Sequence, residues 1–219
     1  MKHVLFKTLA FSLCAAVMVG SLTACLPLVI GGAALGGSLV ATDRRTSGAQ
    51  LEDEGIELRG VSRLRSNLGE RGHVNLTSYN RQVLLTGEVP SAQDKQLAEQ
   101  IVSRVDNVAS VVNELTVSGN SSLTQRSSDT LITGRVKAQL IDAPDLSSNA
   151  FKVVTERGTT YLMGRVTQRE ADRATNVARA TSGVQKVIRI FDFITEDELA
   201  RLLPAPAKPQ PAATRPAAN

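Results

Sequence analysis

The chain of 219 residues is long enough for one large domain or two small ones. Its hydrophobic content of 42% is ordinary for a globular protein and excludes a wholly disordered chain. Aromatic residues make up 3% and Trp is absent, so we expect aliphatic cores and no surface that stacks nucleic-acid bases. The formal net charge of +4 points to a partner only once its position along the chain is known.

Residues 1–24 have the composition of a secretory signal peptide. Lys2 and Lys7 precede an uncharged, mostly apolar run, and the tripeptide Leu-Thr-Ala at 22–24 leads directly to Cys25. This order resembles a bacterial lipobox, in which the cysteine is acylated and becomes the first residue of the mature chain. We therefore predict cleavage before Cys25 and lipid anchoring. The alternative is an uncleaved membrane anchor that continues through the apolar residues 26–40.

Export changes the expected chemistry of the mature protein. Cys14 would leave with the signal peptide and Cys25 would be acylated, so no disulfide is expected and the domains depend on core packing. Cytoplasmic nucleic acid is not an expected partner of an exported, tethered chain. Residues 25–53 are predicted to form the acylated N-terminus and a connector to the first folded unit.

Two segments, 54–118 and 129–195, repeat one order of patterns, with a linker at 119–128. The stretch Val83–Val89 matches Thr160–Val166 at an offset of 77, and the apolar positions of the helix that follows match at 76. Before the strands, Leu64 and Leu68 match Val136 and Leu140 at an offset of 72. The repetition predicts two copies of one small domain.

Each copy predicts the order αββαβ. A short amphipathic helix comes first, with Ser128 or Asp129 as the cap in the second copy, and a hairpin follows. The second helix opens with a capping box, formed by Ser91 with Asp94 or by Thr167 with Glu170, and a last strand closes the unit. We expect an α+β fold in which helices lie on one face of a small three-stranded sheet.

Gly87 and Gly164 stand at matching places where a strand leads toward the capped helix. A turn that requires positive φ, or close packing, explains both glycines better than a phosphate-binding loop. Neither copy contains G-x-G-x-x-G or G-x-x-x-x-G-K.

The charge is unevenly divided between the copies. Residues 54–119 carry seven basic and eight acidic side chains, whereas residues 126–194 carry eleven basic and seven acidic ones, a net charge of +4. Such asymmetry suits a surface that faces anionic lipid, and a solvated mixed-charge surface is the alternative.

Two αββαβ units, each with a hydrophobic-Gly-x-Val step before a helix and a V-x-x-V closing strand, resemble BON domains. The second copy and the segment 41–59 are similar to dual BON-domain outer-membrane lipoproteins of the DolP kind, over about residues 25–195. The resemblance implies an acylated protein of the periplasm that binds anionic phospholipid and supports envelope integrity, with a place at division sites in some members. Leu26 after the acylated cysteine resembles outer-membrane sorting.

The same resemblance places lipid contact on the first helix of the second domain, near a Trp that Leu131 replaces here. Arg135 and Lys137 would then lie beside phospholipid headgroups, while Val136 and Leu140 face the core. Losing the Trp removes an interfacial anchor, so contact would depend more on charge. An ordinary packing helix is the alternative.

No catalytic, metal or cofactor site is expected. His73 is the only histidine after the signal peptide and is interpreted as a surface or capping residue, and no metal-ligand spacing is present. Residues 196–203 predict a short helix, and the Pro- and Ala-rich residues 204–219 predict a disordered tail. The leading hypothesis is a non-enzymatic lipid-binding protein. The alternatives are an adaptor for envelope proteins and a hydrolase whose acid/base groups meet only in the fold.

Overall fold

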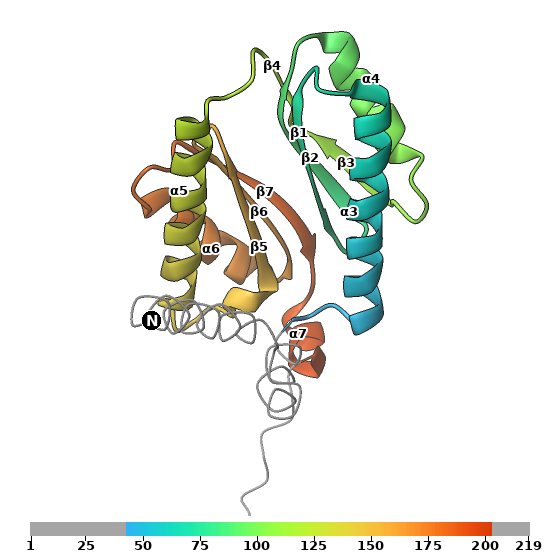
Figure 1. Ribbon diagram of the computed structural model, residues 1–219. Helices are drawn as coiled ribbons and strands as arrows, with labels where there is room; N and C mark the ends of the chain where they lie inside the picture. Colours follow the sequence, from blue (N-terminus) through green and yellow to red (C-terminus); the bar gives the residue numbers. More distant parts are fainter. Residues whose placement is uncertain (1–42, 203–219) are drawn as a thin grey trace, which may run out of the picture. The chain divides into compact units, whose positions relative to one another are not determined.

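The computed structural model describes residues 43–202; Cys25, the signal peptide and the C-terminal tail lie outside this range. The first unit consists of α3 (Ser47–Leu68), β1 (His73–Tyr79), β2 (Gln82–Val89), α4 (Ala92–Ser103), β3 (Ser110–Asn113) and β4 (Thr116–Val117). The second consists of α5 (Leu123–Ile141), the short 3₁₀ helix η2 (Ser148–Ala150), β5 (Phe151–Glu156), β6 (Thr159–Val166), α6 (Gln168–Ala180) and β7 (Lys186–Phe193). Helix α7 (Glu196–Leu202) follows (Figure 1). The predicted α+β class and the doubled αββαβ order are confirmed.

Each sheet combines an antiparallel hairpin with a parallel closing strand. In the first unit β1 pairs with β2, and β3 and β4 run parallel to β2; in the second the order is β5-β6-β7. The closing strand of the first unit is interrupted because Leu115 is buried and its N–H turns to the Asn113 side chain. This interruption divides the predicted single strand into β3 and β4.

Both sheets are covered by helices on one face and meet each other on the other. Helices α3 and α4 pack on the first sheet around buried residues such as Ile56, Leu85 and Val102. Helices α5 and α6 do the same around Val136, Leu162 and Ala174. A third apolar cluster joins the opposite faces of the two sheets and contains Tyr79, Leu84, Tyr161, Met163 and Ile190. The central strands are therefore buried on both faces.

The first helix of each unit begins earlier than predicted. The Thr46 hydroxyl accepts a hydrogen bond from the Ala49 N–H, so α3 starts inside the predicted connector. In the second unit Ser122 accepts from the Gln125 N–H, and neither Ser128 nor Asp129 is the cap. The added turns are mostly exposed and polar, so they contribute little to the apolar periodicity that marks a helix in sequence.

The repeat of the first helix also differs from the prediction by one helical turn. The buried residues Ile56, Gly60 and Leu64 of α3 stand 76 positions before Ile132, Val136 and Leu140 of α5, which are likewise buried. The offset of 72 was therefore wrong, and 76 applies to both helices of the unit.

The two predicted capping boxes differ in completeness. Thr167 and Glu170 form both reciprocal hydrogen bonds. Ser91 accepts from the Asp94 N–H, but the Asp94 carboxylate accepts from the Ser91 hydroxyl, at 2.6 Å, in place of the Ser91 N–H that a complete box would use.

Both matching glycines lie where another backbone approaches closely. Gly87 has φ of +109°, and a Cβ there would stand 1.9 Å from the His73 carbonyl oxygen. At Gly164 a Cβ would stand 2.4 Å from the Ala150 carbonyl oxygen. Both contacts are shorter than a Cβ tolerates, so the backbone of β1 requires glycine at 87 and the backbone of η2, just before β5, requires it at 164.

Candidate lipid-contact surface

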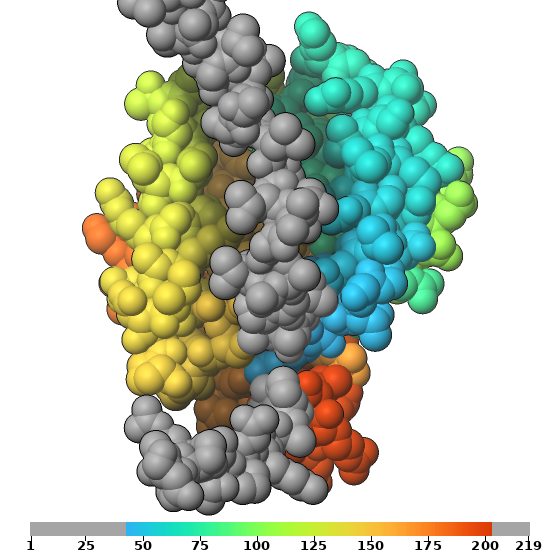
Figure 2. Space-filling view, turned by 60° about the horizontal axis from the view of Figure 1, so that its bottom comes forward, coloured from blue at the N-terminus to red at the C-terminus, as the bar shows by residue number. Residues whose placement is uncertain are grey.

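Helix α5 has a buried side and an uncharged exposed strip. Asp129, Ile132, Val136 and Leu140 are buried against the sheet and α6. The exposed strip contains Leu131, Gly134, Ala138 and Ile141, and the side chains of Leu131 and Ile141 are 61% and 67% exposed. Part of this side of α5 is visible in yellow-green to yellow in Figure 2. Exposed aliphatic residues along one strip can enter the boundary between headgroups and acyl chains.

Arg135 and Lys137 flank this strip on opposite sides. At about 100° per residue, Arg135 lies about 40° to one side of Leu131 and Lys137 about 120° to the other. Both side chains are exposed, and an Arg135 guanidinium N–H donates to the Ser182 carbonyl oxygen at 3.5 Å. The predicted contact residues therefore occupy one accessible helix surface; which of them touches lipid stays a prediction.

Most other cations of the second unit are neutralised locally. Within residues 43–202, six of the eleven basic side chains between 126 and 194 form ion pairs, for example Arg173 with Asp145 and Arg189 with Asp172. Three of the remaining five, Arg126, Arg135 and Lys137, belong to α5. The net positive charge of this unit is thus concentrated on its first helix.

The one acidic residue of α5 is turned away from solvent. Asp129 accepts the N–H groups of Arg157 and Gly158, each at 2.9 Å, at the turn between β5 and β6. An anionic headgroup at the exposed strip would therefore meet no carboxylate from α5 itself. The exposed side of α5 therefore carries cationic, apolar and uncharged polar side chains, and the nearest exposed carboxylate is that of Asp142, directly after the helix.

The first unit repeats this aspartate–turn contact. Asp53 accepts the N–H groups of Asn80 and Arg81 at 2.7 and 2.8 Å. Burial raises the pKa of Asp53, but hydrogen bonds from the Ser78 hydroxyl, the Arg81 N–H and Arg45 outweigh it and leave the pKa below its ordinary value. The sequence analysis did not predict either contact and considered Asp129 as a helix cap, although the two aspartates recur at the spacing of 76 shown by the helices.

A second feature missed in the sequence lies just before α3. The Arg44 guanidinium donates to both carboxylate oxygens of Glu170, at 2.8 and 2.6 Å, and both side chains are buried. Arg45 pairs with Asp53 and lies over the Tyr79 ring, 4.3 Å from its centroid. The segment that leads from the predicted anchor is thereby held by both units.

Three potential metal ligands also meet in the structure. His73, Glu88 and Glu156 each place one ligand atom within 4.8 Å of the others. Sequence reasoning treated His73 alone, because no short spacing links it to the two glutamates. Their proximity comes from the pairing of β1 with β2 and from the contact between the two sheets.

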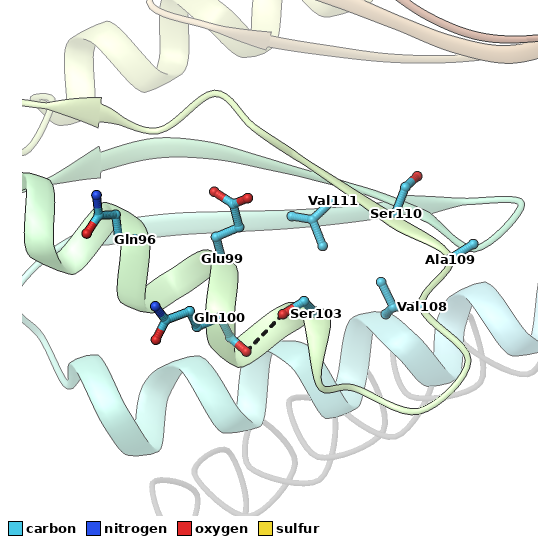
Figure 3. Close-up of a pocket in the computed structure, with 8 residues that line it drawn as sticks. All are labelled: Gln96, Glu99, Gln100, Ser103, Val108, Ala109, Ser110 and Val111. Carbon is cyan, nitrogen blue, oxygen red and sulfur yellow. Dashed lines mark hydrogen bonds between the residues drawn. The ribbon is translucent and has the colours of Figure 1, made fainter.

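A surface hollow of about 390 Å³ between α4 and β3 offers no acid/base pair (Figure 3). Glu99 is the one ionisable residue among those that line it, and its carboxylate accepts a hydrogen bond from Asn113. Hydrolytic chemistry normally needs a second positioned proton-transfer group or a nucleophile. This hollow therefore does not support the hydrolase alternative.

No helix within residues 43–202 has the length and apolar character needed to cross a membrane.

Comparison with known proteins identifies the repeated unit. The model of the BON domain matches residues 59–119 and 128–192, more than half of the chain. Outer membrane lipoprotein DolP of Haemophilus influenzae is 38% identical over 175 residues, which cover 79% of this chain and 90% of that protein. The 21 kDa hemolysin of Actinobacillus pleuropneumoniae is 31% identical, covering 69% of this chain and 79% of that protein. Osmotically-inducible protein Y of Escherichia coli is 31% identical, covering 52% and 58% respectively.

Proposed function

Because the chain belongs to the dual BON-domain outer-membrane lipoproteins of the DolP kind, we propose that it is a non-enzymatic envelope protein whose second BON domain binds anionic phospholipid through α5. Acylated Cys25 would anchor it to the outer membrane with both domains in the periplasm. Binding there would support envelope integrity, including at division sites.

The observation that carries this proposal is the exposed side of α5. An uncharged strip with two large aliphatic side chains lies between Arg135 and Lys137, which form no ion pair within residues 43–202. Each basic residue near an anionic membrane surface contributes about 1 kcal/mol to binding, and exposed aliphatic side chains add apolar contact. With no Trp in this helix, charge has the larger share of the binding energy.

The adaptor alternative rests on a different helix. Leu51 and Leu58 of α3 are 69% and 75% exposed, and a hollow of about 700 Å³ beside Leu58 is lined by Glu54, Glu57 and Arg65 among others. Apolar side chains among charges of both signs suit a protein partner better than an anionic membrane. This surface would serve binding of an envelope protein by the first domain.

Flotation of residues 43–219 with vesicles separates the two functions. This fragment keeps the Arg44 and Arg45 contacts and lacks the acylated cysteine. The double variant Arg135→Glu/Lys137→Glu changes the charge of α5 by four units and should weaken binding to anionic vesicles by up to about 4 kcal/mol at low salt. The loss should shrink at high salt, where charges are screened.

A matched control is available on α3. Arg63→Glu/Arg65→Glu makes the same charge change at the same spacing on the equivalent helix and should leave flotation nearly unchanged. Leu131→Asp should likewise weaken binding where Leu58→Asp does not. Equal binding to neutral and anionic vesicles, or equal loss in the two double variants, would contradict contact through α5. Absence of binding by the unaltered fragment would favour the adaptor.

A further inference from the structure

One side-chain cluster connects the two BON domains independently of the lipid surface. His73 opens β1 and lies opposite Glu88 of β2 in the register of the first sheet. Glu156 ends β5 in the second sheet. The His73 Nδ1 atom stands 3.7 Å from a Glu88 carboxylate oxygen, and one ligand atom from each of the three residues lies within 4.8 Å of the others.

The three side chains bring hydrogen-bond acceptor atoms close together, and these atoms have few hydrogen-bond donors. His73 Nδ1 is buried and has no hydrogen-bond partner within residues 43–202. The Glu88 side chain is fully buried, with Ser121 at 3.2 Å and Arg157 at 3.4 Å as its donors, and Glu156 accepts from Asn75 at 3.0 Å. Arg157 compensates part of the Glu88 charge, but within residues 43–202 Glu156 forms no ion pair and no donor reaches His73 Nδ1, so the cluster has room for a bound cation.

The acid–base properties of the cluster agree with this geometry. Burial, with the nearby Arg126, lowers the pKa of His73 against the opposing effect of Glu88 and leaves a neutral imidazole with a free electron pair. Burial, with Glu88 and Asp129, raises the pKa of Glu156. Burial is the largest cause of both shifts, because it disfavours the charged imidazolium of His73 and the charged carboxylate of Glu156.

We propose that His73, Glu88 and Glu156 bind one divalent cation of the zinc class and thereby join the two BON domains. An imidazole nitrogen with two carboxylate oxygens is a ligand set that Zn²⁺ accepts, whereas Mg²⁺ and Ca²⁺ favour oxygen alone. Ligands at about 2.1 Å from a tetrahedral ion lie about 3.4 Å apart. The His73–Glu88 pair, at 3.7 Å, is close to this separation, and a pair 4.8 Å apart has to approach by about 1.4 Å. A water molecule would complete the coordination.

The surroundings allow a cation to enter and to be neutralised. A groove of about 1100 Å³ lined by His73, Asn75, Arg126 and Glu156, among others, opens beside the cluster. Arg157 contacts the Glu88 oxygen that faces away from His73 and is about half exposed, so it need not leave when the other oxygen binds the ion. The two carboxylates balance the charge of a divalent cation.

Zinc binding tests the proposal on the predicted mature chain, residues 25–219, with Cys25→Ser to remove its one thiol as a ligand. Competition with a chromogenic chelator should show one saturable Zn²⁺ site, and Zn²⁺ should raise the thermal unfolding midpoint where Mg²⁺ does not. His73→Gln and Glu156→Gln should each weaken Zn²⁺ binding at least about tenfold.

The groove provides a matched control, because Glu70→Gln removes the charge of an exposed carboxylate outside the cluster and should leave Zn²⁺ binding unchanged. The ring signals of His73 should shift in NMR spectra on addition of Zn²⁺, a readout that does not depend on any variant. The proposal is overturned if no saturable site is found, if Glu70→Gln weakens binding as much as Glu156→Gln, or if the His73 ring signals do not move. Because no lipid is present, failure here would leave the proposed phospholipid binding untouched.

Discussion

The two BON domains share a chain path and differ in the exposed side of their first helices. At the structural offset of 76, the exposed or half-exposed acidic residues Glu52, Glu54 and Glu57 of α3 correspond to Ser128, Thr130 and Thr133 of α5. Apart from the corresponding aspartates Asp53 and Asp129, the buried positions are apolar or glycine in both helices. The fold thus depends on the buried residues, and the exposed residues are free to determine which partner each domain binds.

One corresponding pair of cations shows how this difference works. Arg59 of α3 and Arg135 of α5 occupy the same place in their helices, but Arg59 pairs with Glu52 at 2.7 Å. Serine stands at the position of Glu52 in α5, so Arg135 has no such partner. The same arginine is neutralised in one domain and available to an anionic surface in the other.

The largest expected difference between the domains is in the stability that is lost when the acidic residue at the start of the second helix is replaced. Glu170→Ala would leave the Arg44 guanidinium buried without its carboxylate and should lower the free energy of unfolding by about 3–5 kcal/mol. Asp94→Ala removes a half-complete cap whose partner Arg71 is 55% exposed, and should cost about 1 kcal/mol. Urea unfolding of residues 43–219 measures both. Equal losses would contradict a special role for the Arg44 contact.

A smaller difference should appear between Asp53 of the first domain and Glu156 of the second, in how each makes the free energy of unfolding depend on pH. The pKa of Asp53 is lowered in the folded chain, so its stabilisation is present above about pH 4 and is lost as pH falls through the folded pKa. Asp53→Asn should cost about 2 kcal/mol at pH 7, because an amide N–H then faces the turn N–H groups, and should remove part of the acid dependence.

Glu156 should behave in the opposite sense in chelator-treated protein. Its folded pKa is raised, so the protonated carboxyl is favoured and stability falls as pH rises from about 4 through the folded pKa. Glu156→Gln should therefore match the unaltered chain at low pH and exceed it in stability at pH 7. Parallel pH profiles for Asp53→Asn and Glu156→Gln, measured by urea unfolding, would contradict this opposition.

The sequence was informative wherever the signal is local. Alternating apolar residues around Asn80 and Arg157 located both hairpins, and Ser91 and Thr167 located the second helices. The first helices were misaligned because Gly60 stands where α5 has Val136: a Cβ there would lie 2.4 Å from the Leu76 side chain. Glycine has no apolar side chain, so the buried position between Ile56 and Leu64 does not show in the hydrophobic periodicity of α3.

Contacts between distant segments left no local signal. Arg44 reaches Glu170 across 126 positions, and Asn75 reaches Glu156 across 81. Only the packing of one sheet against the other brings these residues together. The lipid-contact residues were proposed from family resemblance, and the structure adds that the neighbours of Arg135 leave it unpaired.

The smallest expected effect is also the sharpest test of what separates the two helices. Ser128→Glu gives α5 the carboxylate that pairs with Arg59 in α3, and the seven-residue spacing allows it to reach Arg135 in the same way. Binding to anionic vesicles should fall by about 1–2 kcal/mol, or roughly five- to thirtyfold, because one cation is neutralised and one anion is added. Ser128→Gln, of nearly the same size but uncharged, should change binding little. The converse variant Glu52→Ser frees Arg59 but leaves the exposed Glu54 on the same helix, so α3 should still bind weakly. If Ser128→Glu floats with anionic vesicles as well as the unaltered fragment does, the availability of Arg135 is not what distinguishes the two domains.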